Sequence, residues 1–578
     1  MQGRAFRRIM DRCYSWAKQE FGGTLMAQDA ADAQAGEGAS PPSMRTVVVA
    51  SSAGTAFEWY DFFIFGTLAT IISRNFFAGL NETAGLVAAL ALFGAGFAFR
   101  PLGALIFGRM GDRVGRKAAF LITVTLMGGA TLAIGFLPTY EQAGLIGPAL
   151  LIVLRILQGL ALGGEYGGAA IYVAEHAPDH RRGEYTGWIQ TSAAFGLIGA
   201  LVVILVTRRI VGEEAFADWG WRLPFLVSAG LLAISIFMRL KLAESPSFER
   251  LKAAGEEAKA PFAEAFGQWG NLKIVLLALF AFMSAQGAVW YTAFFYTQIF
   301  LERFLKVAPA TVNTLMICAT LASAPLYVLF AWASDRVGRK WVMWFGMTLA
   351  LIAFFPGFKA LTLAANPALA EAQAATPVVV VADPDDCALQ FDPVDRAQFI
   401  SACDIAKTAL ANAGVSYDNL AAPAGTLAQV RVGETVVSSI EGSQLAPDDL
   451  KAARAQVDGE IRAALAAAGY PSQADPARTN LPAVFGILMI FVVAATALYG
   501  PMAATLVELF PTRVRYTAMS LPYHIGTGWV GGFVPFSAFA IVTATGNIYS
   551  GLWYPVIFTA ISVVVCLFLP ETKGKPLD

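Results

Sequence analysis

Twelve long apolar stretches dominate this sequence and determine the solvent in which most of the chain can fold. A helix needs roughly 20 consecutive, mostly apolar residues to cross the hydrocarbon core of a bilayer. The stretches that meet this need are 47–72, 83–108, 118–137, 144–174, 185–207, 221–242, 272–300, 311–333, 341–361, 482–505, 517–543 and 551–570. Only 14% of the 578 residues are charged, against roughly a quarter in soluble folds. The sequence therefore predicts an all-α membrane protein with twelve transmembrane helices.

The Lys and Arg residues of the connecting loops predict the orientation of these helices, because cytoplasmic loops are enriched in these cations. With residue 1 inside, most loop cations, Arg239 among them, fall in inner connections. The short outer loops hold Arg74, Arg208, Arg209, Arg303 and Lys306. We therefore expect a multi-pass protein of the bacterial inner membrane with both termini in the cytoplasm. Residues 1–43 lack an apolar core long enough for a signal peptide, and translation from either Met1 or Met26 fits this extension.

An internal repeat divides the predicted helices into two sets of six. The hexapeptide Asp-Arg-Val-Gly-Arg-Lys occurs at 112–117 and again at 335–340, an offset of 223 residues that spans six helices. A weaker pair, Glu175–Pro178 and Glu508–Pro511, has an offset of 333 residues, each copy at the inner end of a helix. The two offsets differ by 110 residues, which indicates a duplicated unit with an insertion in its second copy.

The repeat predicts the following organisation. A cytoplasmic extension at 1–43, partly disordered, precedes the first six-helix bundle at 44–242. The second bundle is interrupted by the insertion, which falls in the outside loop after the ninth helix. The remaining predicted segments are a central cytoplasmic loop at 243–271, the two parts of the second bundle at 272–361 and 482–570, and a cytoplasmic tail at 571–578.

The insertion at 362–481 is expected to be a small periplasmic α/β domain. It holds 15 Asp and Glu but only 7 Lys and Arg, so it is acidic. The run of valines at 378–381 predicts a strand, and a second strand-like run covers Val430–Ser439. Amphipathic stretches at 395–413 and 447–469 predict helices.

Cys387 and Cys403 are the two cysteines of this insertion. A domain outside the inner membrane lies in an oxidising compartment, where disulfides form and persist. We expect a disulfide between them, and the alternative is two thiols whose Cα atoms lie too far apart.

Five charged residues lie inside the predicted spans, where each costs at least about 2.5 kcal/mol at the bilayer centre. They are Glu58, Asp61, Arg100, Arg155 and Glu165. Glu58 and Asp61 are three residues apart and share one face of the first helix. Two buried carboxylates this close favour one bound proton near neutral pH, which is the requirement for proton coupling. The alternative is that both pair with Arg100 or Arg155 and only hold helices together.

The fourth predicted helix combines a buried cation with closely spaced glycines. Arg155 should face a carboxylate, either of the protein or of a solute. Arg100, nearer the inner end of its helix, is better explained as a structural cation that extends to the interface. The glycines of 159–168 form small-residue rows that let helices touch. Glu165 lies among them, and a proton-coupling or solute role there competes with a packing role.

Two further sets of residues are candidates for solute binding and gating. The candidate solute contacts, which packing alone would also explain, are Arg155, Tyr166, Gln286, Trp290, Tyr291, Tyr523 and His524. Ion pairs at inner helix ends can hold two halves together in one state and break in the other. The candidate gating residues are Asp112, Arg116, Glu175, Asp335, Arg339 and Glu508. Topology signals would explain the arginines and lysines of these loops but not the repeated Asp and Gly.

The loop Gly108–Lys117 is similar to the signature loop of the major facilitator superfamily. Within it, the chain resembles the metabolite:proton symporters, which include osmoprotectant, shikimate, alpha-ketoglutarate and citrate permeases. The resemblance covers 44–361 and 482–578. The segments that carry it are Glu58–Phe62, Arg100–Gly103, Gln158–Gly159, Gly163–Gly168 and Glu508–Arg513.

The resemblance implies two six-helix bundles around a central cavity, alternating access, and inward symport of a small solute with protons. It also implies that Glu175 engages Arg116 and that Glu508 engages Arg339, an inner gate in each half. The insertion is foreign to most members of the superfamily, so the resemblance implies nothing about its role.

The leading hypothesis is therefore a monomeric, proton-coupled importer of a small polar metabolite, an organic acid or a zwitterion. A sugar porter or uniporter is the first alternative, because Pro570–Gly574 and Glu244–Pro246 resemble sugar transporters. A non-transporting sensor with a periplasmic ligand domain is the second. Three His in 578 residues offer no metal site, and no nucleophile–base set or phosphate loop indicates an enzyme or a cofactor. A net charge of −1 gives no reason to expect a nucleic-acid partner.

Overall fold

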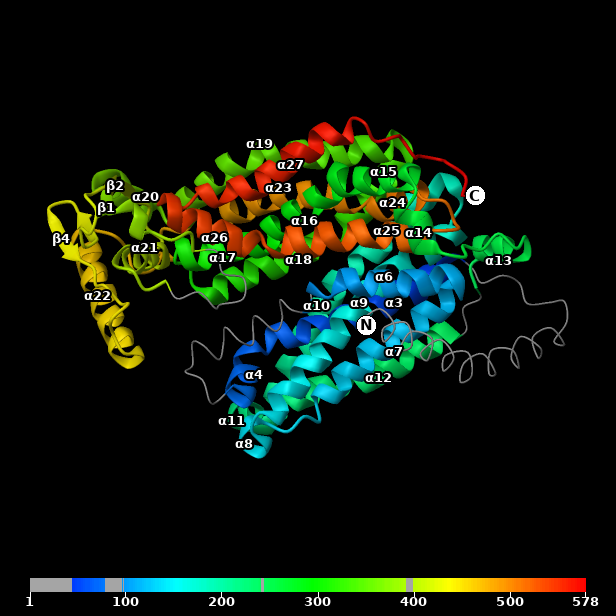
Figure 1. Ribbon diagram of the computed structural model, residues 1–578, viewed down its shortest axis with the longest axis horizontal. Helices are drawn as coiled ribbons and strands as arrows, with labels where there is room; N and C mark the ends of the chain where they lie inside the picture. Colours follow the sequence, from blue (N-terminus) through cyan, green and yellow to red (C-terminus); the bar gives the residue numbers. More distant parts are fainter. Residues whose placement is uncertain (1–43, 78–95, 97, 241–243, 391–398, 578) are drawn as a thin grey trace. The chain divides into compact units, whose positions relative to one another are not determined.

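Helices make up most of the first half of the chain (Figure 1). The computed structural model describes residues 44–77, 96, 98–240, 244–390 and 399–577. The first-half elements are α3 (Met44–Thr67), α4 (Ala69–Phe76), α6 (Arg100–Arg113), α7 (Arg116–Ile134), α8 (Tyr140–Ala143), α9 (Ile146–His176), η1 (Asp179–Arg181), α10 (Arg182–Val211), α11 (Glu213–Ala215), η2 (Phe216–Gly220) and α12 (Arg222–Leu240). The extension at 1–43 and most of the predicted span 83–108 lie outside the described residues.

The second half is also helical, with the insertion between α19 and α23. Before the insertion are α13 (Pro246–Ala253), α14 (Pro261–Phe266), α15 (Trp269–Ala278), η3 (Leu279–Met283), α16 (Ser284–Tyr291), η4 (Thr292–Tyr296), α17 (Thr297–Ile299), η5 (Phe300–Phe304), α18 (Pro309–Val337) and α19 (Arg339–Ala365). After it come α23 (Leu481–Tyr499), α24 (Met502–Leu509), α25 (Arg515–His524), η7 (Ile525–Gly531), α26 (Val534–Thr545), η8 (Ser550–Leu552) and α27 (Trp553–Cys566).

Nine helical segments of the described chain are long and apolar enough to cross a membrane. They are 116–134, 146–176, 179–211, 222–240, 269–304, 309–337, 339–365, 481–509 and 515–545. Each overlaps one predicted span, and Ser550–Cys566 is a shorter apolar helix. Helices are the expected outcome because backbone groups in hydrocarbon must find their hydrogen-bond partners within the same segment. The prediction of an all-α membrane fold is confirmed.

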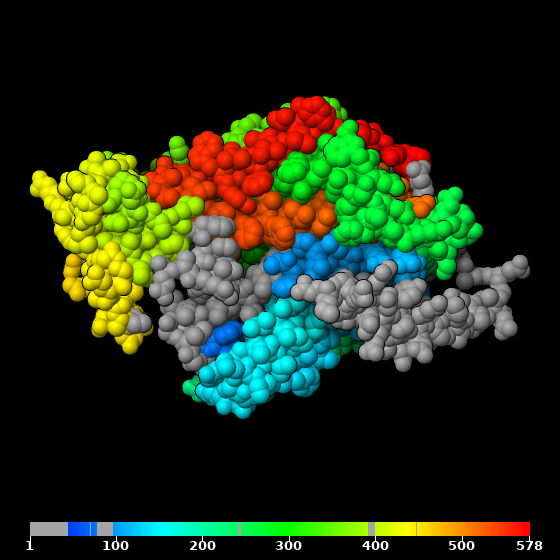
Figure 2. All heavy atoms as spheres, in the orientation of Figure 1, coloured from blue at the N-terminus to red at the C-terminus, as the bar shows by residue number. Residues whose placement is uncertain are grey.

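The two halves pack against each other through matching pairs of helices. α10 of the first half packs along α18 of the second, and α6 of the first packs along α25 of the second. In Figure 2 the blue part of the first half lies against the green and orange parts of the second. Residues at this contact are the ones that a relative movement of the halves would separate.

Glycines allow α6 and α9 to approach closely within the first half. A Cβ added at Gly163 would lie 2.2 Å from the carbonyl oxygen of Arg100, and one at Gly159 would lie 2.6 Å from that of Gly96. Carbonyl oxygens of the backbone cannot move aside as a flexible side chain can. Any side chain at these two positions would therefore force the helices apart.

We expect Gly163→Ala to destabilise the protein by about 1–3 kcal/mol, the cost of overpacking a tight core. The measurement is thermal unfolding of the purified protein in detergent. Gly129→Ala on α7 is the control, because an added Cβ there meets no atom within 4 Å. Equal melting temperatures for the two variants would contradict the close helix contact.

The insertion forms a four-stranded sheet with helices beside it. Its elements are α20 (Pro367–Ala375), β1 (Val378–Ala382), η6 (Pro384–Asp386), α21 (Ala402–Ala413), β2 (Asp418–Ala421), β3 (Gln429–Val432), β4 (Thr435–Ser438) and α22 (Pro447–Ala467). The sheet order is β2-β1-β3-β4, with β1 parallel to β2 and antiparallel to β3. The strand-like run predicted at Val430–Ser439 is extended but divided in two, because Gly433 turns the chain with φ +58° and makes a hairpin of β3 and β4.

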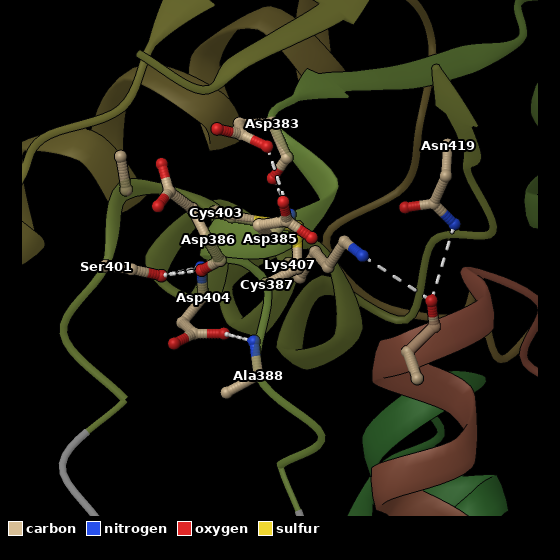
Figure 3. The surroundings of a disulfide bond; sticks show 12 residues. Asp383, Asp385, Asp386, Cys387, Ala388, Ser401, Cys403, Asp404, Lys407 and Asn419 are labelled. Atoms are coloured by element: carbon tan, nitrogen blue, oxygen red, sulfur yellow. Dashed lines mark hydrogen bonds between the residues drawn. A yellow bond between two sulfur atoms is a disulfide. The ribbon is translucent and has the colours of Figure 1, made fainter. Parts of the chain in front are cut away.

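The insertion supplies donors to the last carbonyls of α26, which lack partners within their own helix. Tyr417 donates its hydroxyl to the carbonyl oxygen of Thr543 at 2.5 Å and its backbone N–H to that of Gly546 at 2.7 Å. Asn419 donates to the carbonyl oxygen of Thr545 at 3.1 Å. Figure 3 shows Lys407 and Asn419 directed at this helix end. The insertion is thus bonded to the second half of the chain.

A disulfide joins Cys387 to Cys403, whose Cα atoms are 5.2 Å apart (Figure 3). It links the residue after η6 to the first turn of α21. Beside it, Asp404 accepts a hydrogen bond from the backbone N–H of Ala388 at 3.0 Å. The bond closes a loop of 16 residues.

We expect Cys403→Ser to lower the stability of the insertion by about 3 kcal/mol, because a loop of this length loses its cross-link. Limited trypsin digestion should then cleave within 362–481 faster than in the wild-type protein. Cys318→Ser is the control, since that cysteine is an exposed free thiol. Unchanged protease resistance of the Cys403→Ser insertion would contradict a stabilising role for this bond.

Candidate functional site

The ends of α6 and α18 each carry an aspartate that binds the other half of the molecule. Asp112 accepts hydrogen bonds from the backbone N–H groups of Tyr516 and Thr517, at 3.1 and 2.8 Å, where α25 begins. Asp335, its counterpart in the repeat, accepts from two N–H groups at the start of α10, at 2.9 and 2.7 Å. A carboxylate is favoured at the positive end of a helix dipole. We call the end of the molecule that holds these contacts the loop face.

Two buried ion pairs cross between the halves at the same face. Arg515 of the second half lies 2.5 Å from Glu175 of the first. Arg182 of the first half lies 2.8 Å from Glu508 of the second, and Arg339 lies 3.0 Å from the same carboxylate. All five side chains are at most 1% exposed. These ion pairs join the two halves at the loop face.

The partner of Glu175 differs from the one that the family resemblance implied. Arg116 was expected there, but its guanidinium lies 2.9 Å from Asp112 and also donates to the carbonyl oxygen of Thr512 at 2.7 Å. Glu175 pairs with Arg515 instead. The reason is geometric. Arg116 lies at the start of α7, and its guanidinium is already bonded to Asp112 and to the carbonyl oxygen of Thr512 in the loop after α24.

Arg182 and Arg515 supply the cations of these ion pairs, and neither is among the gating residues predicted from the sequence. Each follows its helix-end glutamate by seven residues, from Glu175 to Arg182 and from Glu508 to Arg515. Both pairs therefore share the 333-residue offset of the repeat. Extending the repeat comparison by seven positions would have found them.

Glu244 anchors the start of α7 at this face. Its carboxylate accepts the backbone N–H groups of Arg116 at 3.1 Å and Lys117 at 3.2 Å. Burial raises the pKa of Glu244, and the N–H bond from Ser245, the Arg116 charge and the N–H bonds from Lys117 and Arg116 partly offset that rise. Glu571 accepts the N–H groups of Arg339 and Lys340 in the same way at the start of α19.

The buried carboxylates of the first half have a partner that the sequence analysis had placed in a loop. Arg239 lies in the last turn of α12 with its side chain 1% exposed. Its guanidinium is 2.6 Å from Glu58 on α3 and 3.8 Å from Glu165 on α9. The prediction that Arg239 belongs to an inner connection is therefore wrong, because the helix turns this side chain toward the core.

Asp61 has a different environment from Glu58. It is 4% exposed, and it accepts a hydrogen bond from the hydroxyl of Ser228 on α12 at 2.5 Å. A hydroxyl can bond equally to a carboxylate and to a neutral carboxyl group. Asp61 can therefore gain or lose a proton without losing this partner.

Arg100 and Arg155 are both buried and lie over aromatic rings of α3. The guanidinium carbon of Arg100 is 4.7 Å from the ring centre of Phe62, and that of Arg155 is 4.0 Å from that of Phe65. Arg155 also donates to the amide oxygen of Gln158 at 2.7 Å. Arg100 is only 3% exposed, so the expectation that it extends to the membrane interface is wrong.

Tyr166 and Tyr523, two of the candidate solute contacts, meet between the halves. Their rings stack with centres 3.8 Å apart and planes at 4°. Gln190 donates to the Tyr166 hydroxyl at 2.8 Å, and the hydroxyls of Tyr523 and Tyr499 are 3.2 Å apart. This stack joins α9 to α25.

The other candidate solute contacts are distributed over α16 and α25. Gln286 and His524 are 3% and 1% exposed. Tyr291 packs its ring against Trp290 and Phe295. Tyr291, Tyr523 and His524 lie near the guanidinium of Arg100, which in turn lies near that of Arg155.

A cavity of about 90 Å³ lies at the contact between the halves. Trp290 is the one candidate solute contact that lines it, and its indole N–H donates to the hydroxyl of Tyr327 at 2.9 Å. The lining residues are Phe63, Ala193, Ala194, Leu197, Trp290, Phe294, Phe295, Gln298, Met316, Thr320, Ser323 and Tyr327. Ser323 and Tyr327 were not predicted from the sequence, because single polar residues in an apolar helix give no signal.

The chain matches known transporters along both halves. The family model described as "Sugar (and other) transporter" matches residues 46–268 and 461–578. The shikimate transporter of Escherichia coli (strain K12) is 36% identical over 325 residues, 55% of this chain and 72% of that protein. The proline/betaine transporter of the same strain is 33% identical over 326 residues, 54% of this chain and 64% of that protein.

A solved structure shares the fold. The structure of the proton:xylose symporter XylE of the major facilitator superfamily, bound to 6-bromo-6-deoxy-D-glucose, has a TM-score of 0.58 at 16% identity. The alignment covers 92% of this chain and 97% of that one. The resemblance to metabolite:proton symporters is confirmed by the relatives, and the family is one of transporters and not of enzymes. The chain belongs to the sugar (and other) transporter family of the major facilitator superfamily.

Proposed function

We propose that this protein is a secondary active transporter that carries a small polar metabolite into the cell together with protons. The observation that carries the proposal is the buried carboxylate of Asp61, which is bonded to the neutral hydroxyl of Ser228. An ionised carboxylate at bilayer depth is costly, so Asp61 is suited to hold a proton there and release it when water enters.

Alternating access follows from the two-fold arrangement of the loop-face contacts. We propose twelve spans in two six-helix bundles, made of the nine long apolar helices, α3, the span that ends in α6, and α27. The Lys and Arg bias assigns the loop face to the cytoplasm of a bacterial cell, with both termini on that side and the insertion in the periplasm. The ion pairs of Glu175 and Glu508 would then be closed in this structure and open during release.

The solute class we propose is a carboxylate-bearing metabolite, either an organic acid or a zwitterion. Arg100 and Arg155 place two guanidinium groups in the buried core, where they suit an anionic group. Two relatives are named for shikimate and for proline and betaine, and each of these compounds carries a carboxylate. We propose that a monomer in the bilayer is sufficient.

The test is uptake by purified protein in liposomes with an inward proton gradient. Shikimate, proline, glycine betaine and xylose are offered separately, with and without a protonophore. We expect at least about ten-fold accumulation of one of the carboxylates, lost when the protonophore is added. Carboxylate uptake indifferent to the protonophore would support a uniporter. Xylose uptake alone would support a sugar porter, which the XylE fold and the Pro570–Gly574 segment make the second candidate.

A further inference from the structure

Arg239 is shared unequally between two buried carboxylates on different helices. Its guanidinium lies at 2.6 Å from Glu58 but at 3.8 Å from Glu165. The side chains of both glutamates are only 4% exposed. The Oε1 atom of Glu165 and both carboxylate oxygens of Glu58 lack a hydrogen bond of good geometry from the described residues. Arg239 is therefore in close ion-pair contact with one carboxylate and within reach of a second.

The guanidinium of Arg239 lies beside a glycine of α3 and against an aromatic ring of α7. A Cβ at Gly54, one turn before Glu58 on α3, would lie 2.8 Å from Nη2 of Arg239. From α7, the ring centre of Phe120 lies 3.6 Å from its guanidinium carbon. This ring attracts the cation without fixing its hydrogen bonds, as a cation–π contact does.

The charges of this cluster do not balance without a proton. One guanidinium faces two carboxylates, so the buried cluster carries a net charge of −1 when both are ionised. An uncompensated buried charge is expensive, and one bound proton removes it. The nearby titratable groups are Asp61 on α3 and Tyr516 on α25.

Glu165 is adjacent in the chain to a contact between the halves. The carbonyl oxygen of Gly164 accepts a hydrogen bond from the hydroxyl of Tyr516. The backbone N–H of Tyr516 in turn donates to Asp112 of the loop face at 3.1 Å. A movement of α9 at Glu165 therefore acts directly on a bond that holds the loop face closed.

We propose that Arg239 is a positioning residue that moves from Glu58 to Glu165 when Glu58 takes up a proton, and that this movement loosens the loop face. The inference rests on the proposed proton-coupled transport. Ionised Glu58 holds the arginine and keeps α9 in its closed position. Protonated Glu58 gives up its ion pair, and Glu165 is then the ionised carboxylate within 4 Å of the guanidinium among the described residues.

The experiment uses protons as the ligand, so it does not depend on knowing the solute. Spin labels are attached at Val114→Cys and Val337→Cys, which are exposed positions at the loop-face ends of α6 and α18. Cys13 and Cys318 are replaced by Ser. The distance between the labels is measured by electron resonance in lipid nanodiscs from about pH 8 to about pH 6.

In the wild-type protein we expect the open fraction to rise as the pH falls. Glu58→Gln should be open at pH 8 at least about five-fold more than the wild type, because it mimics the protonated state. Arg239→Gln should lose the pH dependence, and Arg239→Lys should retain it with a shifted midpoint. The exposed Arg250→Gln on α13 is the matched control and should behave as the wild type.

Two results would overturn the inference. One is an unchanged pH midpoint in Arg239→Gln. If that variant fails to fold, the neutral pair Glu58→Gln with Arg239→Gln replaces it, and a retained midpoint there has the same meaning. The other is a wild-type loop face that ignores pH. Uptake by the wild type is measured separately with a protonophore. If that uptake is sensitive to the protonophore, the proposed proton-coupled transport stands even when either result overturns the role of Arg239.

Discussion

Asp61→Asn is expected to abolish proton-driven accumulation while leaving exchange of solute across the membrane intact. Asparagine has the shape of a protonated aspartate, and its side-chain oxygen can keep the hydrogen bond from Ser228 that the structure shows at 2.5 Å. It cannot release a proton. The variant should therefore complete the solute-loaded half of the cycle but gain nothing from a proton gradient.

The size of the effect follows from the driving force. Each proton moved through about 100 mV contributes about 2.3 kcal/mol, which supports about fifty-fold accumulation of a co-transported solute. Asp61→Asn should reduce this ratio to about one. The measurement compares gradient-driven uptake with counterflow, in which labelled solute exchanges with unlabelled solute at equal pH.

Asp218→Asn is the matched control, because Asp218 lies exposed in η2 and should leave both assays unchanged. Gradient-driven uptake by Asp61→Asn at the wild-type level would show that another group carries the proton. Loss of counterflow together with uptake would show instead that Asp61 is needed for the conformational change itself.

Arg515→Ala should have a much larger effect on the loop face than Arg182→Ala, although the two arginines are related by the repeat. Removing Arg515 leaves Glu175 buried without the one cation that pairs with it among the described residues. Breaking a buried pair in this way costs about 3–5 kcal/mol. Removing Arg182 still leaves Glu508 paired with Arg339 at 3.0 Å.

The lost ion pair destabilises only the closed state. The equilibrium constant for opening of the loop face should therefore be more than about a hundred-fold larger in Arg515→Ala than in the wild type. The distance between spin labels at Val114→Cys and Val337→Cys measures this opening. The exchange Glu175→Arg with Arg515→Glu restores an ion pair and should recover part of the closed state. Equal open fractions in Arg515→Ala and Arg182→Ala would contradict the asymmetry of the two clusters.

Some of the loop-face gate was predictable because its residues recur at fixed offsets. The pairing of Glu508 with Arg339 was expected from the family resemblance, and the structure contains it. The pairing of Glu175 with Arg116 was expected on the same grounds and is wrong, since Arg116 is held by Asp112 and Thr512. A motif identifies which residues are available, but the packing of α7 decides which acceptor each one meets.

In the insertion, too, local elements were predictable from the sequence and their contacts were not. Its valine strand and its helix at Pro447–Ala467 follow from local pattern and are present in the structure. The hairpin at Gly433 was missed, because a strand-like run with one glycine reads the same whether or not the chain reverses there. Its bonding to the end of α26 has no signal in the sequence.

The sequence by itself determined that the chain is a helical membrane protein, and its repeat predicts a duplication and the place of the extra segment. These properties depend on hydropathy and on spacing along the chain. A long apolar segment in a bilayer forms a helix, because only a helix satisfies its backbone hydrogen bonds within the segment. Only the tertiary structure decided that Arg239 forms an ion pair with Glu58 and that Arg515 forms one with Glu175. The physical reason is that a buried charge is satisfied by whichever opposite charge the helix packing brings within about 4 Å, and sequence distance carries no information about that.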